Sequence, residues 1–266
     1  MTALKKVATA TNLKFLAIIL MFLDHIHEMF LEMGAPIWLN MLGRMVFPIF
    51  LFLAADSFYY TRNRAHYMRR LLYMSWFMVI ANFIIGSLFD NGQIGLANNA
   101  FSTFFVTGIY ICAWDLLVEG VKSKSIKGIF KALGLCFLPI VLVLPILFLG
   151  NFLTMVNLSP ILSRGLALTV LLIPNILTAE GGFLMVLLGL FFYIFREKFL
   201  WKIGSLAIIS LLMYITDPAS VQWMMIFAAI PIYFYNGEKG RGDKSFFYIF
   251  YPAHLYLLYI LASLLH

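Results

Sequence analysis

The chain has 266 residues, of which 63% are hydrophobic and only 12% are charged. Typical soluble domains carry about 25% charged residues, so this composition excludes a soluble globular protein. The net charge of +7 does not indicate a nucleic-acid partner, because the basic residues stand in short clusters between apolar runs, as in the cytoplasmic loops of membrane proteins. The apolar runs are continuous rather than alternating, which favours helices over a membrane barrel. We therefore expect an all-α polytopic protein in the lipid bilayer, with one transmembrane domain over residues 1–266.

Ten apolar segments are candidate membrane spans, which predicts a bundle of about 9–10 transmembrane helices. They cover residues 13–31, 37–60, 67–88, 98–119, 128–149, 158–177, 181–195, 201–215, 220–236 and 246–265. The basic clusters fit a cytoplasmic N-terminus if the region 128–195 crosses the membrane an even number of times. One segment between residues 150 and 195 is therefore expected to be re-entrant or interfacial, with breaks at Pro160, Pro174, Asn175 and the Gly181–Gly182 pair.

The first span carries ionisable residues in its second half. Asp24 and His25 follow a continuous apolar run. A charged side chain near the bilayer centre costs at least roughly 2.5–3.5 kcal/mol on insertion scales, and it usually faces a bundle interior or a wet cavity. Asp24 and His25 are therefore candidate site residues. His27 and Glu28 approach the end of the span and are expected to be solvated.

Two further side chains are expected at a similar depth. With a rise of about 1.5 Å per residue, His25 and Arg44 each lie roughly 9 Å below the outer end of their span. His254 lies roughly 12 Å above the inner end of the last span. The first two spans are joined by a short loop, so Arg44 is expected to pair with Asp24. Pro48 is expected to kink the second span just below Arg44.

Several motifs carry a family resemblance. They are Met21-Phe-Leu-Asp24-His25-Ile26, Gly43-Arg44-Met-Val-Phe47-Pro48, Tyr60-Thr61-Arg62-Asn63 and Phe247-Tyr-Ile-Phe-Tyr251-Pro252-Ala-His254-Leu. Over nearly the whole chain, they resemble the TraX family of bacterial membrane acetyltransferases, named for acetylating the N-terminus of conjugative pilin. The resemblance implies a place in the bacterial cytoplasmic (inner) membrane. It also implies transfer of an acetyl group from cytoplasmic acetyl-CoA to an amine or hydroxyl of an envelope or exported acceptor, such as a peptide N-terminus or a glycan.

Acyl transfer needs a base for the acceptor's proton and a group that stabilises the developing oxyanion. His25 is the first candidate for the base, because the ordinary imidazole pKa of about 6.5 lies near the working pH. Arg44 is the candidate for carbonyl stabilisation, and Asp24 would balance its charge or orient a histidine. His254 is the second candidate for the base, or a proton relay.

Two basic segments are candidates for holding the phosphates of acetyl-CoA. The first contains Arg62 and Arg64, and the second contains Lys239, Arg241 and Lys244. Arginine suits phosphate, and the glycines of the second segment allow close backbone approach. An alternative interpretation is that these basic residues set the orientation of the protein in the membrane and contact anionic lipids.

Other interpretations of the buried polar residues stay open. They could form an inert cluster that fixes helix register, the proton relay of a transporter or flippase, or part of a membrane binding protein. Dependence on acetyl-CoA distinguishes the enzyme from the others. Cys112 and Cys136 lie inside apolar runs without metal-ligand spacing, so no metal site is expected.

Overall fold

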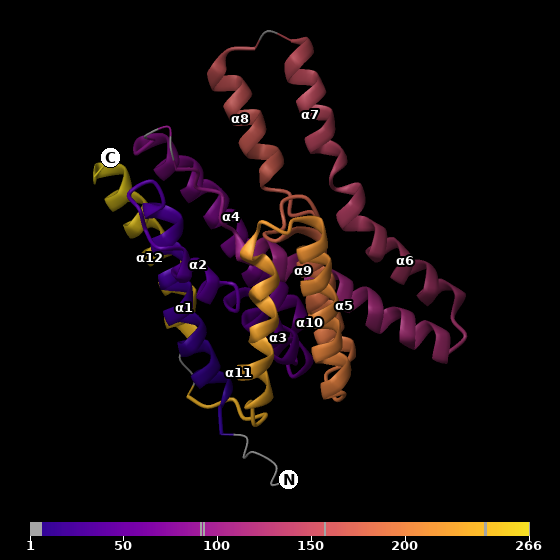
Figure 1. Ribbon diagram of the computed structural model, residues 1–266. Helices are drawn as coiled ribbons and strands as arrows, with labels where there is room; N and C mark the ends of the chain where they lie inside the picture. The colour runs from indigo at the N-terminus through magenta and orange to yellow at the C-terminus, as the bar shows by residue number, and fades with distance from the viewer. Residues whose placement is uncertain (1–6, 91, 93, 157, 242–243, 266) are drawn as a thin grey trace. The chain divides into compact units, whose positions relative to one another are not determined.

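The computed structural model describes residues 7–265 except 91, 93, 157, 242 and 243, and these described residues form helices and loops with no strand (Figure 1). Six of the described helices are long and apolar enough to cross a membrane. They are Ile37–Tyr59, Arg64–Leu88, Ala100–Lys122, Ile126–Leu153, Phe199–Thr216 and Phe246–Leu265. Three shorter apolar helices accompany them, Ile161–Leu171, Gly182–Ile194 and Val221–Tyr233. The prediction of an all-α polytopic membrane protein is confirmed.

The chain forms two compact units, and each is described by itself. The first unit contains residues 1–56, 85–96 and 194–266. Its helices are α1 (Ala10–Phe30), α2 (Ile37–Gly43), most of α3 (Val46–Tyr59), α10 (Phe199–Thr216), the 3-10 helix η1 (Val221–Ala228), α11 (Ala229–Tyr233) and α12 (Lys244–Leu265). Within this unit α1 packs against both α2 and α12, which brings the first and last helices of the chain together (Figure 1). The expectation of one domain over residues 1–266 stays a prediction.

The second unit contains residues 57–84 and 97–193. Its helices are most of α4 (Arg64–Leu88), α5 (Ala100–Lys122), α6 (Ile126–Val141), α7 (Leu144–Met155), α8 (Pro160–Leu171) and most of α9 (Gly182–Ile194). Helices α5 and α6 pack closely, because Gly120 and Gly128 leave no side chain between them. Helices α7 and α8 form a hairpin whose large apolar side chains are mostly exposed, as suits contact with lipid (Figure 1).

The interruptions of the helices follow from the sequence. The helix expected over residues 37–60 breaks between α2 and α3, at Arg44 and Met45. Pro48 lacks an N–H group, so it leaves the carbonyl of Arg44, four residues earlier, without its helical partner. The break expected before α9 also occurs, where Gly181 and Gly182 have φ angles of +73° and +66°. The number of full crossings stays a prediction.

Candidate functional site

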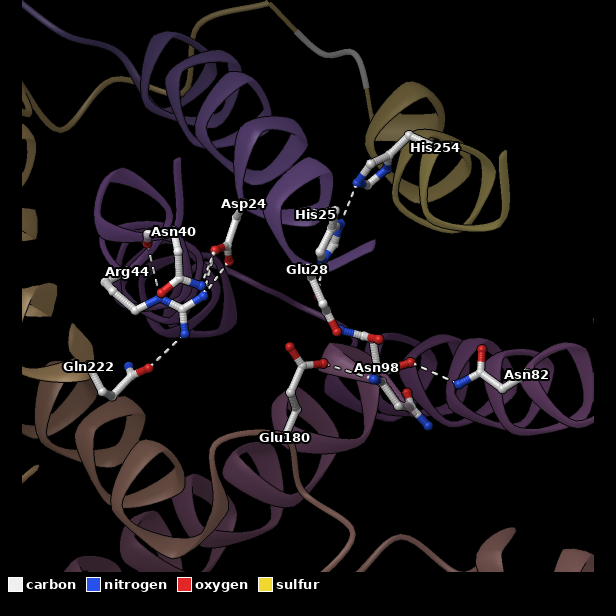
Figure 2. A network of polar contacts seen from close by, with 11 residues as sticks. Asp24, His25, Glu28, Asn40, Arg44, Asn82, Asn98, Glu180, Gln222 and His254 are labelled. Carbon is white, nitrogen blue, oxygen red and sulfur yellow. Dashed lines mark hydrogen bonds and ion pairs between the residues drawn. The ribbon is translucent and has the colours of Figure 1, made fainter. Parts of the chain in front are cut away.

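An ion pair joins the first helix to the helix break that follows it. Arg44 Nη2 lies 2.6 Å from both carboxylate oxygens of Asp24 (Figure 2). Asn40 Nδ2 donates a third hydrogen bond to Asp24 Oδ1, at 3.1 Å. The Asp24 and Arg44 side chains are 15% and 24% exposed, so the charges are mostly removed from solvent and neutralise each other. The predicted pairing of these two residues is therefore present in the structure.

The orientation of Arg44 is fixed by further contacts. Its Nε–H donates to the carbonyl oxygen of Asn40 at 3.2 Å, and its Nη1 donates to Gln222 Oε1 at 2.8 Å. Since Nη2 contacts both oxygens of the Asp24 carboxylate, the guanidinium group is held through all three of its nitrogens. Gln222, on η1, was not found from the sequence, because no spacing rule connects it to Arg44.

Gly43 allows the ion pair to form. A Cβ atom built at this position would overlap the side chain of Asp24. The glycine of the Gly43-Arg44 motif therefore makes room for the carboxylate that Arg44 binds. This role could not be predicted from the sequence, since it depends on how α1 and α2 cross.

His25 and His254 meet in the interior of the first unit. His25 Nδ1 lies 2.7 Å from His254 Nε2, and the two imidazole rings stack with their centroids 4.9 Å apart (Figure 2). The residues are 5% and 4% exposed. The second ring nitrogen of His254, Nδ1, lies 2.6 Å from the carbonyl oxygen of Phe250, one turn earlier in α12. The residues predicted to converge from the two ends of the chain are thus in direct contact.

Aromatic rings surround this pair of histidines, which we call the histidine dyad. Phe250 stacks on His254 at 4.7 Å, and Phe22 and Tyr251 lie within 6.3 Å of one or both imidazoles. These rings provide an apolar wall that limits the access of water. The Nε2 atom of His25 lies 3.8 Å from Glu28 Oε2, beyond hydrogen-bonding distance.

One expectation about a neighbouring residue was wrong. His27 is 6% exposed instead of solvated, because its Nδ1 donates to the carbonyl oxygen of Ala35 at 3.1 Å and so closes the turn between α1 and α2. Asp56 of α3 accepts a hydrogen bond from the hydroxyl group of Tyr235 at 2.9 Å.

The second basic segment is attached to the start of α1. The Thr11 hydroxyl donates to the carbonyl oxygens of Lys239, at 2.9 Å, and Arg241, at 2.6 Å. Gly240 has a φ angle of +70°, and a Cβ atom there would lie 2.6 Å from the Thr9 hydroxyl oxygen. Lys239 and Arg241 themselves are exposed, so a firmly held backbone presents two cationic side chains. Lys244, the third predicted residue, is the first residue of α12.

The first basic segment belongs to the second unit, and its two arginines differ. Arg62 is exposed in the loop before α4. Arg64 instead forms an ion pair through Nη1 with Asp115 of α5, and its Nη2 donates to the Tyr193 hydroxyl at 3.0 Å. Tyr193 donates in turn to Asp115 Oδ2 at 2.7 Å. Arg64 therefore ties three helices together, and its predicted contact with phosphate stays a prediction.

The comparisons with known proteins agree with these features. A family model described as "TraX protein" matches residues 9–262, which include the ion pair and both histidines of the dyad. The chain belongs to the TraX family. The family resemblance predicted from the motifs is thus confirmed. A curated relative is the "Probable fimbrial assembly protein FimC, serogroup H1" of Dichelobacter nodosus, 28% identical over 258 residues, which cover 94% of each chain. No solved structure matches the chain significantly.

Proposed function

We propose that this TraX chain is an integral-membrane acetyltransferase with His25 as its general base. The observation that carries the proposal is that consecutive residues of α1 hold the Asp24–Arg44 pair and the buried histidine dyad. A neutral imidazole can accept a proton, and a compensated charge pair leaves the resting site without a net charge. The family match supports the same class of chemistry.

The reaction begins when the acceptor's amine or hydroxyl attacks the thioester carbonyl of acetyl-CoA. His25 removes the proton from the attacking group as the new C–N or C–O bond forms. The guanidinium group of Arg44 donates a hydrogen bond to the developing oxyanion. When the tetrahedral intermediate collapses, the C–S bond breaks and the thiolate of CoA takes the proton from His25. The base is thereby restored.

The acyl donor is proposed to enter from the cytoplasm of a bacterium, with the protein in the inner membrane and its N-terminus inside. Lys239 and Arg241 suit the phosphates of CoA, because both side chains are exposed on a backbone held by Thr11. Lys244, Arg62 and Arg64 are further candidates for this contact.

The acceptor is proposed to be a component of a surface fimbria, either a peptide N-terminus or a glycan hydroxyl. The support is the printed name of the Dichelobacter nodosus relative, which refers to fimbrial assembly. Its sequence aligns with this chain from one end to the other, so the similarity is not confined to a shared module.

The test is transfer of radiolabelled acetyl-CoA by purified protein to a bacterial envelope extract, compared between the wild type, His25→Ala and His66→Ala. His66 is an exposed histidine of α4 and serves as the matched control. We expect the wild type and His66→Ala to label an extract component and His25→Ala to label none. If the wild type neither binds nor hydrolyses acetyl-CoA, the proposal is wrong. Transport driven by a proton gradient in liposomes would then favour the transporter.

A further inference from the structure

The histidine dyad is part of a directional chain of hydrogen bonds. The chain begins at the carbonyl oxygen of Phe250, continues through His254 and ends at His25. A carbonyl oxygen can only accept, so Nδ1 of His254 must carry the hydrogen of the 2.6 Å contact. In a neutral imidazole the other nitrogen then has no hydrogen and acts as an acceptor.

The direction of this hydrogen bond determines the direction of the one between the two histidines. His254 Nε2, as an acceptor, requires that His25 Nδ1 donates across the 2.7 Å between them. His25 is thereby held in the tautomer whose Nε2 atom carries a lone pair. This is the nitrogen that lies 3.8 Å from Glu28 Oε2 and makes no contact with His254.

We propose that His254 is a positioning residue, which holds His25 in the Nδ1–H tautomer so that His25 Nε2 is the nitrogen that accepts the proton during transfer. This inference rests on the proposed function and deepens it, because it assigns different roles to the two histidines. His254 neither attacks nor accepts the acceptor's proton.

The same bond stabilises the protonated intermediate. When His25 Nε2 takes the proton, the ring becomes an imidazolium whose Nδ1–H already donates to His254. A hydrogen bond from a charged donor is roughly twice as strong as one between neutral groups, so the contact strengthens as the proton arrives. The proton then leaves from Nε2 to the thiolate of CoA, and the dyad returns to its neutral state.

Two substitutions separate positioning from proton transfer. His254→Gln can place its amide oxygen where Nε2 stood and accept the hydrogen of His25 Nδ1, but an amide does not take up the proton. His254→Leu removes the acceptor. We expect acetyl transfer by His254→Gln to stay within about tenfold of the wild type, and transfer by His254→Leu to fall about 100-fold, within the usual contribution of a positioned base. If both variants lose transfer equally while remaining folded, His254 carries the proton itself and the inference is wrong.

The tautomers of the two histidines can also be determined without an activity assay. In protein labelled with ¹⁵N-histidine, nitrogen chemical shifts distinguish protonated from unprotonated ring nitrogens, and His25→Gln and His254→Gln assign the signals. We expect a hydrogen on Nδ1 and none on Nε2 for both residues of the dyad. A hydrogen on Nε2 of His25 in the wild type overturns the inference, even if transfer proceeds. If transfer is absent but the expected tautomers are present, the proposed function fails and the hydrogen-bond chain stands.

Discussion

The contact between Gly43 and Asp24 yields a prediction that tests the site through stability. Replacing Gly43 by alanine adds a Cβ atom that overlaps the side chain of Asp24. To relieve the overlap, α1 and α2 must separate or Asp24 must leave Arg44. Inserting one carbon into a packed interior costs about 1–3 kcal/mol, and breaking a buried ion pair costs about 3–5 kcal/mol. Since the pair is 15% and 24% exposed and can relax partly, we expect a loss of about 2–4 kcal/mol.

The matched control is Gly204→Ala. Gly204 lies in α10, in the same unit, and a Cβ atom there would meet nothing within 4 Å. Alanine should be neutral or stabilise this helix by up to about 1 kcal/mol. Thermal unfolding in detergent, followed by tryptophan fluorescence, should show Gly43→Ala melting roughly 4–8 °C below the wild type, at about 2 °C per kcal/mol. If Gly43→Ala melts at or above the wild-type temperature, the conclusion that Gly43 packs closely against Asp24 is wrong.

Three further substitutions test other contacts. Gln222→Ala should lower the melting temperature by the equivalent of about 1–3 kcal/mol, because a donor of Arg44 loses its acceptor. Gln222→Glu, which keeps an acceptor, should melt near the wild type in the same assay, and equal losses would contradict the contact. Asp115→Ala should cost about 1 kcal/mol in that assay, since the ion pair with Arg64 is about one third exposed, and no change would mean that the pair is unimportant. Thr11→Val should free the backbone of the second basic segment, because the valine side chain cannot bind its carbonyl oxygens. Acetyl-CoA binding, measured by equilibrium dialysis, should then weaken by about threefold to tenfold. Unchanged binding would mean that this segment does not hold acetyl-CoA.

Much of the fold could be predicted because apolar runs determine membrane helices directly. Most expected segments overlap observed helices, although the segments at 128–149 and 220–236 are each divided between two helices. Pro48 indicated the break at Arg44. The Asp24–Arg44 pair was also predictable, since consecutive helices joined by a short turn place residues of equal depth beside each other. The similar depths of His25 and His254 in their helices predicted that the two residues lie near each other. Their direct contact could not be predicted, because it depends on the rotation of each helix about its axis.

The residues whose roles could not be predicted from the sequence have a physical feature in common. Gln222, Gly43 and Asp115 act through contacts that depend on the angles at which helices cross, and a single sequence carries no signal of those angles. His27 was mistaken for a solvated residue because its position near a helix end was considered without the chain reversal that covers it.

The spacing of the two polar contacts along the chain has a consequence for biosynthesis. Asp24 and Arg44 are 20 residues apart, so the ion pair can form as soon as α1 and α2 have left the ribosome. His25 and His254 are 229 residues apart. At the usual rates of translation, roughly 10–45 s separate the insertion of one from the arrival of the other. The first helix can therefore compensate its charge locally and early, whereas the contact between the two histidines forms only after the last helix has been made.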